Sequence, residues 1–261
     1  MSGNNISYPI IRPLGEDSVL VEFEAKVDLE INRKARRLVH GLEQANLAGL
    51  KMAIPAYRSV SVYFDPFIAT ASQIIRAVET ISTDLSQQEE LPARLFRLPT
   101  VYGSHHGPDL DRVADVTGLS PNEVINICST IRLPVFFLGF ICSQAYLGGV
   151  PKVIQVPRHD SPRPLVPGGS FGIAGPQANI LAVDSPSGLS YLGRTFVKVF
   201  NPSTFPPTAF RPGDQVQCPA VNEDQALAAG KKGMEEFIEP LLTIKSGLSD
   251  NLPGLGSAGH A

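Results

Sequence analysis

Residues 157–200 constrain the fold more than any other part of the chain. They contain six prolines and six glycines between short apolar runs, and they carry few charges. Proline and glycine interrupt helices and mark turns between short strands. Glycine also lets the backbone approach another strand or a ligand closely. This stretch therefore predicts a small barrel of short strands that presents its loops to a small molecule.

The chain before this stretch predicts a separate α/β unit over residues 1–100. Its apolar patterns predict four strands and two amphipathic helices. The strands are expected at residues 18–23, 51–55, 59–64 and 93–101, and the helices at 29–45, capped by Asp28, and at 68–81. The second helix is expected to bury Ile68, Ala71, Ile75, Val78 and Ile81. The order β-α-β-β-α-β is that of a ferredoxin-like split βαβ unit.

Residues 101–218 predict a second unit that begins with a pair of helices. The first is expected at residues 108–117 and ends at Gly118. The second begins at the capping box of Ser120 and Glu123 and runs to about residue 129. From residue 136 the pattern alone predicts a small antiparallel barrel.

The remaining residues, 219–261, predict a tail that is helical and partly disordered. A helix is expected over about residues 223–239, although Gly230 and Gly233 weaken it, and Pro240 ends it. Residues 246–261 are rich in glycine and serine, and such composition is typical of disorder.

The composition excludes several classes of protein. The net charge of −3 does not indicate the excess of basic residues that binding to nucleic acid or to an anionic membrane requires. No apolar run approaches the roughly 20 residues that span a bilayer, and the N-terminus lacks an apolar signal core. The three cysteines, Cys128, Cys142 and Cys218, match neither a disulfide framework nor a zinc motif. We therefore expect a cytoplasmic protein without a metal site.

Standard catalytic signatures are missing or lack their structural context. The chain has no H-E-x-x-H and no phosphate-binding G-x-x-x-x-G-K motif. Residues 254–259 fit G-x-G-x-x-G, but no helix can follow them before the chain ends. Residues 168–172 fit G-x-S-x-G around Ser170, yet the following glycines and proline oppose the helix that a nucleophile elbow needs. We therefore expect no cofactor in this chain.

Four residues of the barrel region are candidates for a site. Arg163 lies between two prolines and can clamp a carboxylate with both guanidinium nitrogens, or it can bond loop carbonyls structurally. Gln177 can bind a substrate carbonyl or amide, or satisfy the backbone of a turn. Ser170 and Lys152 are further candidates for substrate binding, against the alternatives of a turn serine and a solvated lysine.

Two other loops carry candidate chemistry. His105 and His106 form a pair that can act as acid or base near neutral pH, or they are ordinary turn residues. Cys142 and Gln144 lie in a second loop and are further candidates for substrate binding. A thiol beside a histidine indicates a nucleophile, whereas an isolated cysteine is commonly a small buried residue.

Five blocks of the sequence, in order, resemble the family of 5-oxoprolinase B subunits, also called the allophanate hydrolase subunit 1 or Kip inhibitor (KipI) family. They are PAYRS at 55–59, YG and GPDL within 102–110, LGF and YLGG within 138–149, SPRP, PGGS and GIAG with Gln177 within 161–177, and LGRT at 192–195. The resemblance implies a cyclophilin-like β-barrel that ends near Cys218. It also implies a small-molecule amide- or lactam-cleaving enzyme in which a second, related barrel subunit takes part and ATP acts only through that partner. In that enzyme Arg163 would hold a carboxylate and Gln177 would orient the amide.

The chain departs from the family pattern in its loops. His105 replaces a glutamate, and the loops at 141–147, 175–179 and 186–189 differ. Three functions therefore stay open. The first is the hydrolase-like subunit. The second is a stand-alone cyclase, isomerase or lyase, monomeric or homodimeric, with His105 or His106 as acid or base and Arg163 as an anion clamp. The third is a non-catalytic binding protein similar to the kinase-inhibiting Kip inhibitor.

Overall fold

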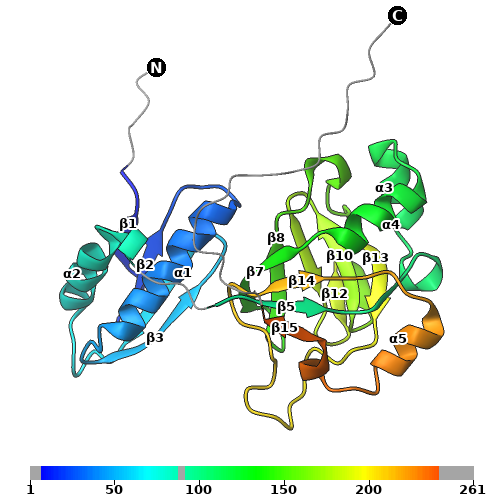
Figure 1. The fold of residues 1–261 in the computed structure, drawn as a ribbon. Helices are drawn as coiled ribbons and strands as arrows, with labels where there is room; N and C mark the ends of the chain where they lie inside the picture. The colour runs from blue at the N-terminus through cyan, green and yellow to red at the C-terminus, as the bar shows by residue number, and fades with distance from the viewer. Residues whose placement is uncertain (1–6, 88–91, 241–261) are drawn as a thin grey trace, which may run out of the picture.

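Two β-sheets of unequal size and a two-stranded ribbon organise the computed structural model, which describes residues 7–87 and 92–240 (Figure 1). The smaller sheet and two helices form the N-terminal unit. The larger sheet is curled and carries the other helices along its outside (Figure 1). The chain is therefore a mixed α/β structure, as the sequence pattern predicts.

The N-terminal unit packs two amphipathic helices on one face of a four-stranded antiparallel sheet. The sheet order is β1-β2-β4-β3. Its elements are β1 (Ile10–Pro13), β2 (Ser18–Glu22), α1 (Leu29–Gln44), β3 (Leu50–Pro55), β4 (Ser59–Phe64), α2 (Ala71–Ser82) and the short 3-10 turn η1 (Leu85–Gln87). Alternate residues of β4, including Val60 and Val62, are buried against Leu38 and Leu42 of α1 and Val78 of α2. The predicted alternation of residues 59–64 is confirmed.

Two expectations for this unit are wrong in detail. The strand predicted at 93–101 does not complete the small sheet, because its residues pair within the larger sheet. The edge beside β2 is instead occupied by β1, which the sequence pattern did not predict. The second helix also begins later than expected, because Thr70 forms a capping box with Gln73. Ile68 consequently precedes the helix and is exposed, while Ile74 is buried.

The larger sheet has nine strands in the order β15-β5-β14-β7-β8-β11-β10-β13-β6. In chain order they are β5 (Arg94–Arg97), β6 (Thr100–Tyr102), β7 (Leu133–Gly139), β8 (Gln144–Gly148), β10 (Ser170–Ala174), β11 (Gln177–Ile180), β13 (Ser190–Thr195), β14 (Gln215–Gln217) and β15 (Ile238–Pro240). The ribbon pairs β9 (Arg163–Val166) with β12 (Ser185–Ser187). The helices are α3 (Leu110–Thr117), α4 (Pro121–Thr130) and α5 (Glu223–Ala229), with 3-10 turns η2 (Ser104–His106), η3 (Lys152–Ile154) and η4 (Met234–Phe237).

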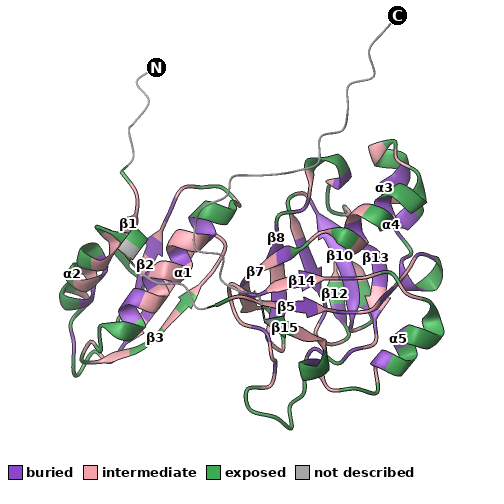
Figure 2. Cartoon of the chain, in the orientation of Figure 1, coloured by how far each residue is buried: buried purple, intermediate pink, exposed green. Residues whose placement is uncertain are grey.

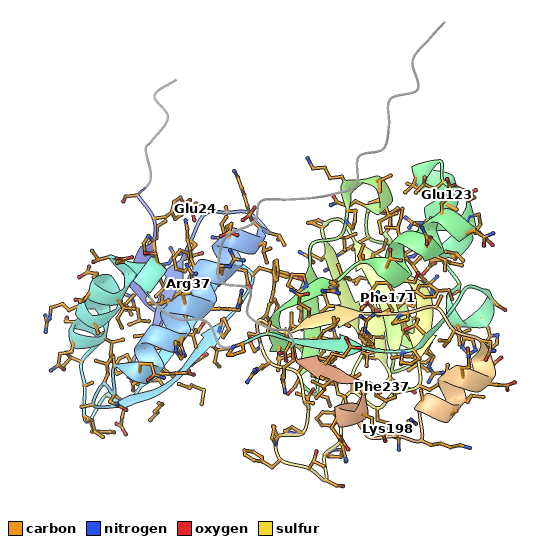
Figure 3. The ribbon with its side chains drawn as sticks, viewed as in Figure 1. Glu24, Arg37, Glu123, Phe171, Lys198 and Phe237 are labelled. Atoms are coloured by element: carbon orange, nitrogen blue, oxygen red, sulfur yellow. The ribbon has the colours of Figure 1, made fainter. Side chains whose placement is uncertain are left out.

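Backbone bonds at Thr100 curl the sheet back on itself. On one side Thr100 pairs with Thr195 of β13. On the other side its N–H donates to the Pro219 carbonyl at 2.9 Å, and its carbonyl accepts from Val221 N at 3.0 Å. The curled sheet encloses apolar side chains such as Phe171, which is fully buried and lies among the strands of the larger unit (Figure 3).

Helices α3 and α4 lie close to where the sequence predicts them, although α3 begins at Leu110 rather than at residue 108. Gly118 ends α3 in the left-handed conformation at φ +73°, which glycine adopts without strain. The capping box of Ser120 and Glu123 begins α4. Figure 2 shows buried residues concentrated on the strands and on the inner faces of these helices.

The tail adds a short helix and a strand rather than one long helix. The helix α5 ends at Ala229 with Gly230 as its C-cap, and a Cβ at Gly230 would lie 2.8 Å from the Phe196 carbonyl oxygen. The chain then turns through η4, and β15 pairs antiparallel with β5 at the edge of the large sheet. The predicted helix over 223–239 is therefore wrong beyond residue 229. The disorder predicted for residues 246–261 concerns residues outside those the structure describes.

Asn32 of α1 joins the two units. Its side chain is fully buried, and its amide donates to the Ala56 carbonyl at 3.0 Å and to the Phe136 carbonyl of β7 at 3.3 Å. Tyr57, which follows Ala56, packs edge-on against Phe136 and Phe137. The turn between β3 and β4 is thereby fixed against the outer face of the large sheet.

Across residues 7–87 and 92–240, the structure contains no helix with the length and apolarity needed to cross a membrane.

Candidate functional site

A cavity of about 400 Å³ lies where the β3–β4 turn meets the large sheet. Strands β8 and β11 supply one wall, and the segments around residues 158–162 and 186–189 supply another. Its polar lining residues are Tyr57, Gln144, Tyr146, Arg158, Gln177, Asn179 and Ser187. The cavity is large enough for a small organic molecule.

Aromatic rings form one side of the cavity. The Tyr146 ring stacks on the Phe137 ring, with centroids 4.4 Å apart and planes 7° apart. The Tyr57 ring meets the Phe137 ring edge-on, with centroids 4.8 Å apart. Alternate residues of β8 point to opposite faces of the sheet. Tyr146 therefore faces the cavity, whereas Ala145 and Leu147 belong to the core.

Two buried polar atoms at the cavity have no partner among the described residues. They are the hydroxyl oxygen of Tyr57 and Oε1 of Gln144. Buried polar atoms are nearly always hydrogen-bonded, because an unmade bond costs about 1–3 kcal/mol. Burial raises the pKa of Tyr57 well above its ordinary value, nearby Tyr146 raises it further, and the charge of Arg158 only partly opposes the rise. Tyr57 is therefore a neutral hydroxyl that can donate to a ligand.

Arg158 provides the positive charge of the cavity. Its side chain is exposed, and Nη2 lies 3.4 Å from Oε1 of Gln177. The amide of Gln177 thus helps to orient a guanidinium whose other donors can bind an anion. Ser187, which lines the cavity, accepts at Oγ from the hydroxyl of the buried Tyr191 at 2.7 Å. The cavity therefore combines a cation, a hydroxyl donor and amide groups beside aromatic rings.

Arg163, the arginine that the sequence singled out, is paired within the chain. Its Nη2 lies 2.5 Å from Oδ1 of Asp109, and its Nη1 lies 2.8 Å from Oδ2. Nε2 of His159 lies 3.2 Å from Asp109 Oδ1, and the backbone N–H of Tyr191 donates to Oδ2 at 2.7 Å. Arg163 does clamp a carboxylate with two nitrogens, but here that carboxylate is internal. Its role toward a substrate stays a prediction.

These contacts lower the pKa of Asp109. Burial acts in the opposite direction and is the largest single effect. The hydrogen bonds from Arg163 and from Tyr191 N, together with the charges of Arg163 and His159, outweigh it. Asp109 is therefore a charged carboxylate that ties α3, β13 and the loop before β9 together.

His105 and His106 lie on η2, away from the cavity lining. His106 is buried, and its Nε2 lies 3.1 Å from Oε1 of Glu223 on α5. His105 is exposed, and its Nε2 lies 4.0 Å from the same oxygen. The two imidazole rings lie against each other, with centroids 3.8 Å apart. The structure thus brings the histidines together with Glu223 and not with Arg163.

The other candidates lie in different places. Gln144 and Gln177 line the cavity. Ser170 is buried in β10, and Lys152 is exposed on η3. Cys142 is half-buried in the turn before β8 and is not among the lining residues. No structural finding tests their predicted roles.

Sequence reasoning did not propose Tyr57, Tyr146, Arg158, Asn179 or Asp109 as functional. Tyr57, Tyr146 and Asp109 do fall within the blocks that carry the family resemblance, and that is the signal by which they could have been found. Arg158 carries no such signal. It reaches the cavity only because the loop after η3 folds over β11.

Replacing Tyr57 by phenylalanine tests whether the Tyr57 hydroxyl lacks a hydrogen-bond partner within the chain. The change removes a buried hydroxyl that has no partner among the described residues, and it keeps the ring that packs on Phe137. We expect the free energy of unfolding of the isolated chain to rise by about 1 kcal/mol in urea denaturation. A loss of stability would show that the hydroxyl is bonded within the chain. The matched change Tyr63→Phe, on β4 away from the cavity, serves as the control.

Comparison with known proteins shows the family of the chain. The carboxyltransferase domain family, subdomains C and D, matches residues 9–210. The chain belongs to this family. Two bacterial relatives are each named as the B subunit of 5-oxoprolinase. The one from Bacillus subtilis is 32% identical over 223 residues, which are 82% of this chain and 93% of the relative. The one from Escherichia coli O157:H7 is 34% identical over 207 residues, which are 78% of this chain and 92% of the relative.

The fold recurs in longer proteins. TTHA0988 superposes with a TM-score of 0.69 at 30% identity over 82% of this chain, and the chain spans 40% of its length. The urea amidolyase of K. lactis has the same TM-score at 21% identity over 86% of this chain, which spans 15% of that protein. In both proteins a segment with this fold is thus one part of a longer polypeptide.

Proposed function

We propose that the chain is a subunit of an ATP-dependent enzyme that opens an amide or lactam C–N bond in a small carboxylate, with 5-oxoproline as the first candidate. The observation that carries this proposal is the cavity that brings the Arg158 guanidinium together with the Tyr57 hydroxyl and the Gln144 oxygen. Neither of these two buried oxygens has a partner among the described residues. The relatives named as 5-oxoprolinase B subunits, which match over more than nine-tenths of their own length, support the proposal.

The groups of the cavity complement those of such a substrate. A carboxylate can accept from the Arg158 guanidinium in a charge-assisted bond. A lactam carbonyl can accept from the Tyr57 hydroxyl, and a lactam N–H can donate to Oε1 of Gln144. A small ring then lies against the aromatic rings of Tyr57 and Tyr146. The ligand would thus provide a partner for both buried oxygens.

The cavity is suited to holding a substrate rather than to activating it. Among its described lining residues there is no aspartate, glutamate, histidine, cysteine or lysine. Breaking an unactivated amide requires a nucleophile and acid–base groups. We therefore assign ATP use and activation to a partner, a second and related barrel subunit. The longer relatives, in which this fold is one part of the polypeptide, are consistent with such a partner.

Two further assignments belong to the same proposal. The curled sheet corresponds to the cyclophilin-like barrel of the family. We assign the complex to the cytoplasm, where ATP-consuming metabolism takes place.

An activity assay with the partner tests this function. The chain is co-expressed with the proteins encoded by its neighbouring genes, and ATP-dependent hydrolysis of 5-oxoproline is measured. We expect Arg158→Ala to lower kcat/KM about 10- to 100-fold, since a hydrogen bond to a charged group contributes about 1.5–3 kcal/mol. Arg132→Ala, at an exposed site outside the cavity, is the control and should leave kcat/KM unchanged.

Two other outcomes would contradict this proposal. Equal activity of the Arg158→Ala and Arg132→Ala enzymes would show that the cavity does not take part in the reaction. Turnover of a small molecule by the chain alone would support the stand-alone cyclase, isomerase or lyase.

A further inference from the structure

We propose that His105, His106 and Glu223 form a binding site for a divalent transition-metal ion, for which Zn²⁺ is the representative. The three side chains come from η2 and from the first turn of α5, 117 residues later in the chain. Their ligand atoms all lie within 4.8 Å of one another. The site is separate from the cavity, whose described lining includes none of the three.

The distances match what a metal ion needs. Zn–N and Zn–O bonds of about 2.0–2.2 Å in a tetrahedral site place neighbouring ligand atoms about 3.4 Å apart. Oε1 of Glu223 lies 3.1 Å from Nε2 of His106 and 4.0 Å from Nε2 of His105. Both values differ from that separation by well under one ångström. The third separation, between the two histidines, is within the 4.8 Å that bounds the whole set, and the His105 ring is exposed.

The backbone around the histidines is firmly held. Gly103 N donates to the Leu192 carbonyl at 3.0 Å, and Gly107 N donates to the Gly103 carbonyl at 2.8 Å. Gly107 passes so close to β13 that a Cβ there would lie 1.9 Å from the Leu192 oxygen. The His106 ring packs edge-on against Phe196, with centroids 5.5 Å apart. His106 and the backbone are thus positioned before a ligand binds.

The ligand types determine which metals fit. Two imidazoles and one carboxylate suit zinc and neighbouring transition metals, whereas calcium and magnesium prefer oxygen ligands alone. Nδ1 of His105 lies 3.5 Å from Oγ of Ser104, which is placed to orient the ring through its second nitrogen. His105 and Glu223 are exposed, so an ion has a path to the site and keeps a coordination position open to solvent. Three protein ligands with one open position are the arrangement of catalytic rather than structural zinc sites.

Pattern reading alone did not predict this site. Zinc motifs on helices and in zinc fingers contain pairs of ligands that are separated by several residues, whereas His105 and His106 are adjacent. The carboxylate of Glu223 is also far from them in the sequence. Only the packing of α5 beside η2 brings Glu223 to the imidazoles.

Zinc titration of the chelator-treated full-length chain tests the proposal. Isothermal calorimetry should show saturable binding of one Zn²⁺ per chain. We expect His105→Ala and Glu223→Gln each to weaken the Zn²⁺ affinity at least tenfold. His40→Ala, on α1, and Asp224→Asn, next to Glu223 on α5, are matched controls and should leave the affinity unchanged. Thermal unfolding without metal verifies that each variant folds.

The Co²⁺-substituted chain gives an independent readout. Its visible spectrum should indicate nitrogen and oxygen ligands and should change in Glu223→Gln. The proposal is overturned by the absence of saturable binding, by unchanged affinity in both site variants, or by a thiolate-to-cobalt charge-transfer band that assigns the ion to a cysteine such as Cys142.

Discussion

Replacing Asp109 by asparagine is expected to lower the free energy of unfolding by about 3–5 kcal/mol, the usual cost of removing one partner of a buried ion pair. The Asp109 side chain is almost completely buried and accepts from both terminal nitrogens of Arg163 and from Tyr191 N. Asparagine keeps the size of the side chain but removes its charge and one acceptor oxygen. Arg163 and His159 would then face a neutral amide. Urea denaturation at neutral pH measures the loss.

The pH dependence follows from the sign of the pKa shift. The folded state lowers the pKa of Asp109, so its charge stabilises the folded chain fully above the ordinary aspartate pKa of about 3.9. This stabilisation begins to decrease as the pH falls below about 3.9, and it is lost once the pH has also fallen through the lower pKa that Asp109 has in the folded state. The difference between wild type and Asp109→Asn should therefore be constant at neutral pH and shrink in acid. Asp111→Asn, at an exposed position in the first turn of α3, should change stability little, and an equal effect of both variants would contradict the assigned role.

Replacing Asp214 by asparagine is expected to have an effect of similar size, about 3–5 kcal/mol. The Asp214 side chain is completely buried and accepts from the Arg94 side chain, with Nε at 3.0 Å and Nη2 at 2.6 Å. It also accepts from the backbone nitrogens of Arg94 and Arg211, at 3.2 and 2.9 Å. These bonds fix the start of β5 beside β14, where the chain enters the large sheet.

Thermal unfolding provides the measurement for Asp214. The variant should unfold at a clearly lower temperature, while the exposed Asp115→Asn should match the wild type. An unchanged midpoint would mean that the contacts around Asp214 are replaced by solvent at little cost.

Local signals in the sequence predicted local structure well. Asp28 caps α1, Gly118 ends α3, and the pair of Ser120 and Glu123 begins α4, each as expected. Such signals act within one turn of a helix, so neighbouring residues specify them completely. The sheet partner of residues 94–97 was not predictable in the same way. Pairing of β5 with β14 joins residues 94–97 to residues 215–217, and the order of strands along the chain does not determine it.

The candidate site shows the same limit. The sequence around Arg163 indicated an arginine able to hold a carboxylate, but it contained no sign that Asp109, 54 residues earlier, would supply one. Gln144 and Gln177 were proposed separately, and the pairing of β8 with β11 brings both to one cavity. Tyr57 joins them only through the packing of the β3–β4 turn on β7.

A crystal structure of the chain with 5-oxoproline, alone or with the proposed partner subunit, tests the central claim most directly. The account predicts the ligand in the cavity, with its carboxylate at Arg158, its carbonyl at the Tyr57 hydroxyl and its N–H at Oε1 of Gln144. A ligand bound elsewhere, at His105 or at Arg163 after release from Asp109, would contradict the assignment of the cavity as the substrate site.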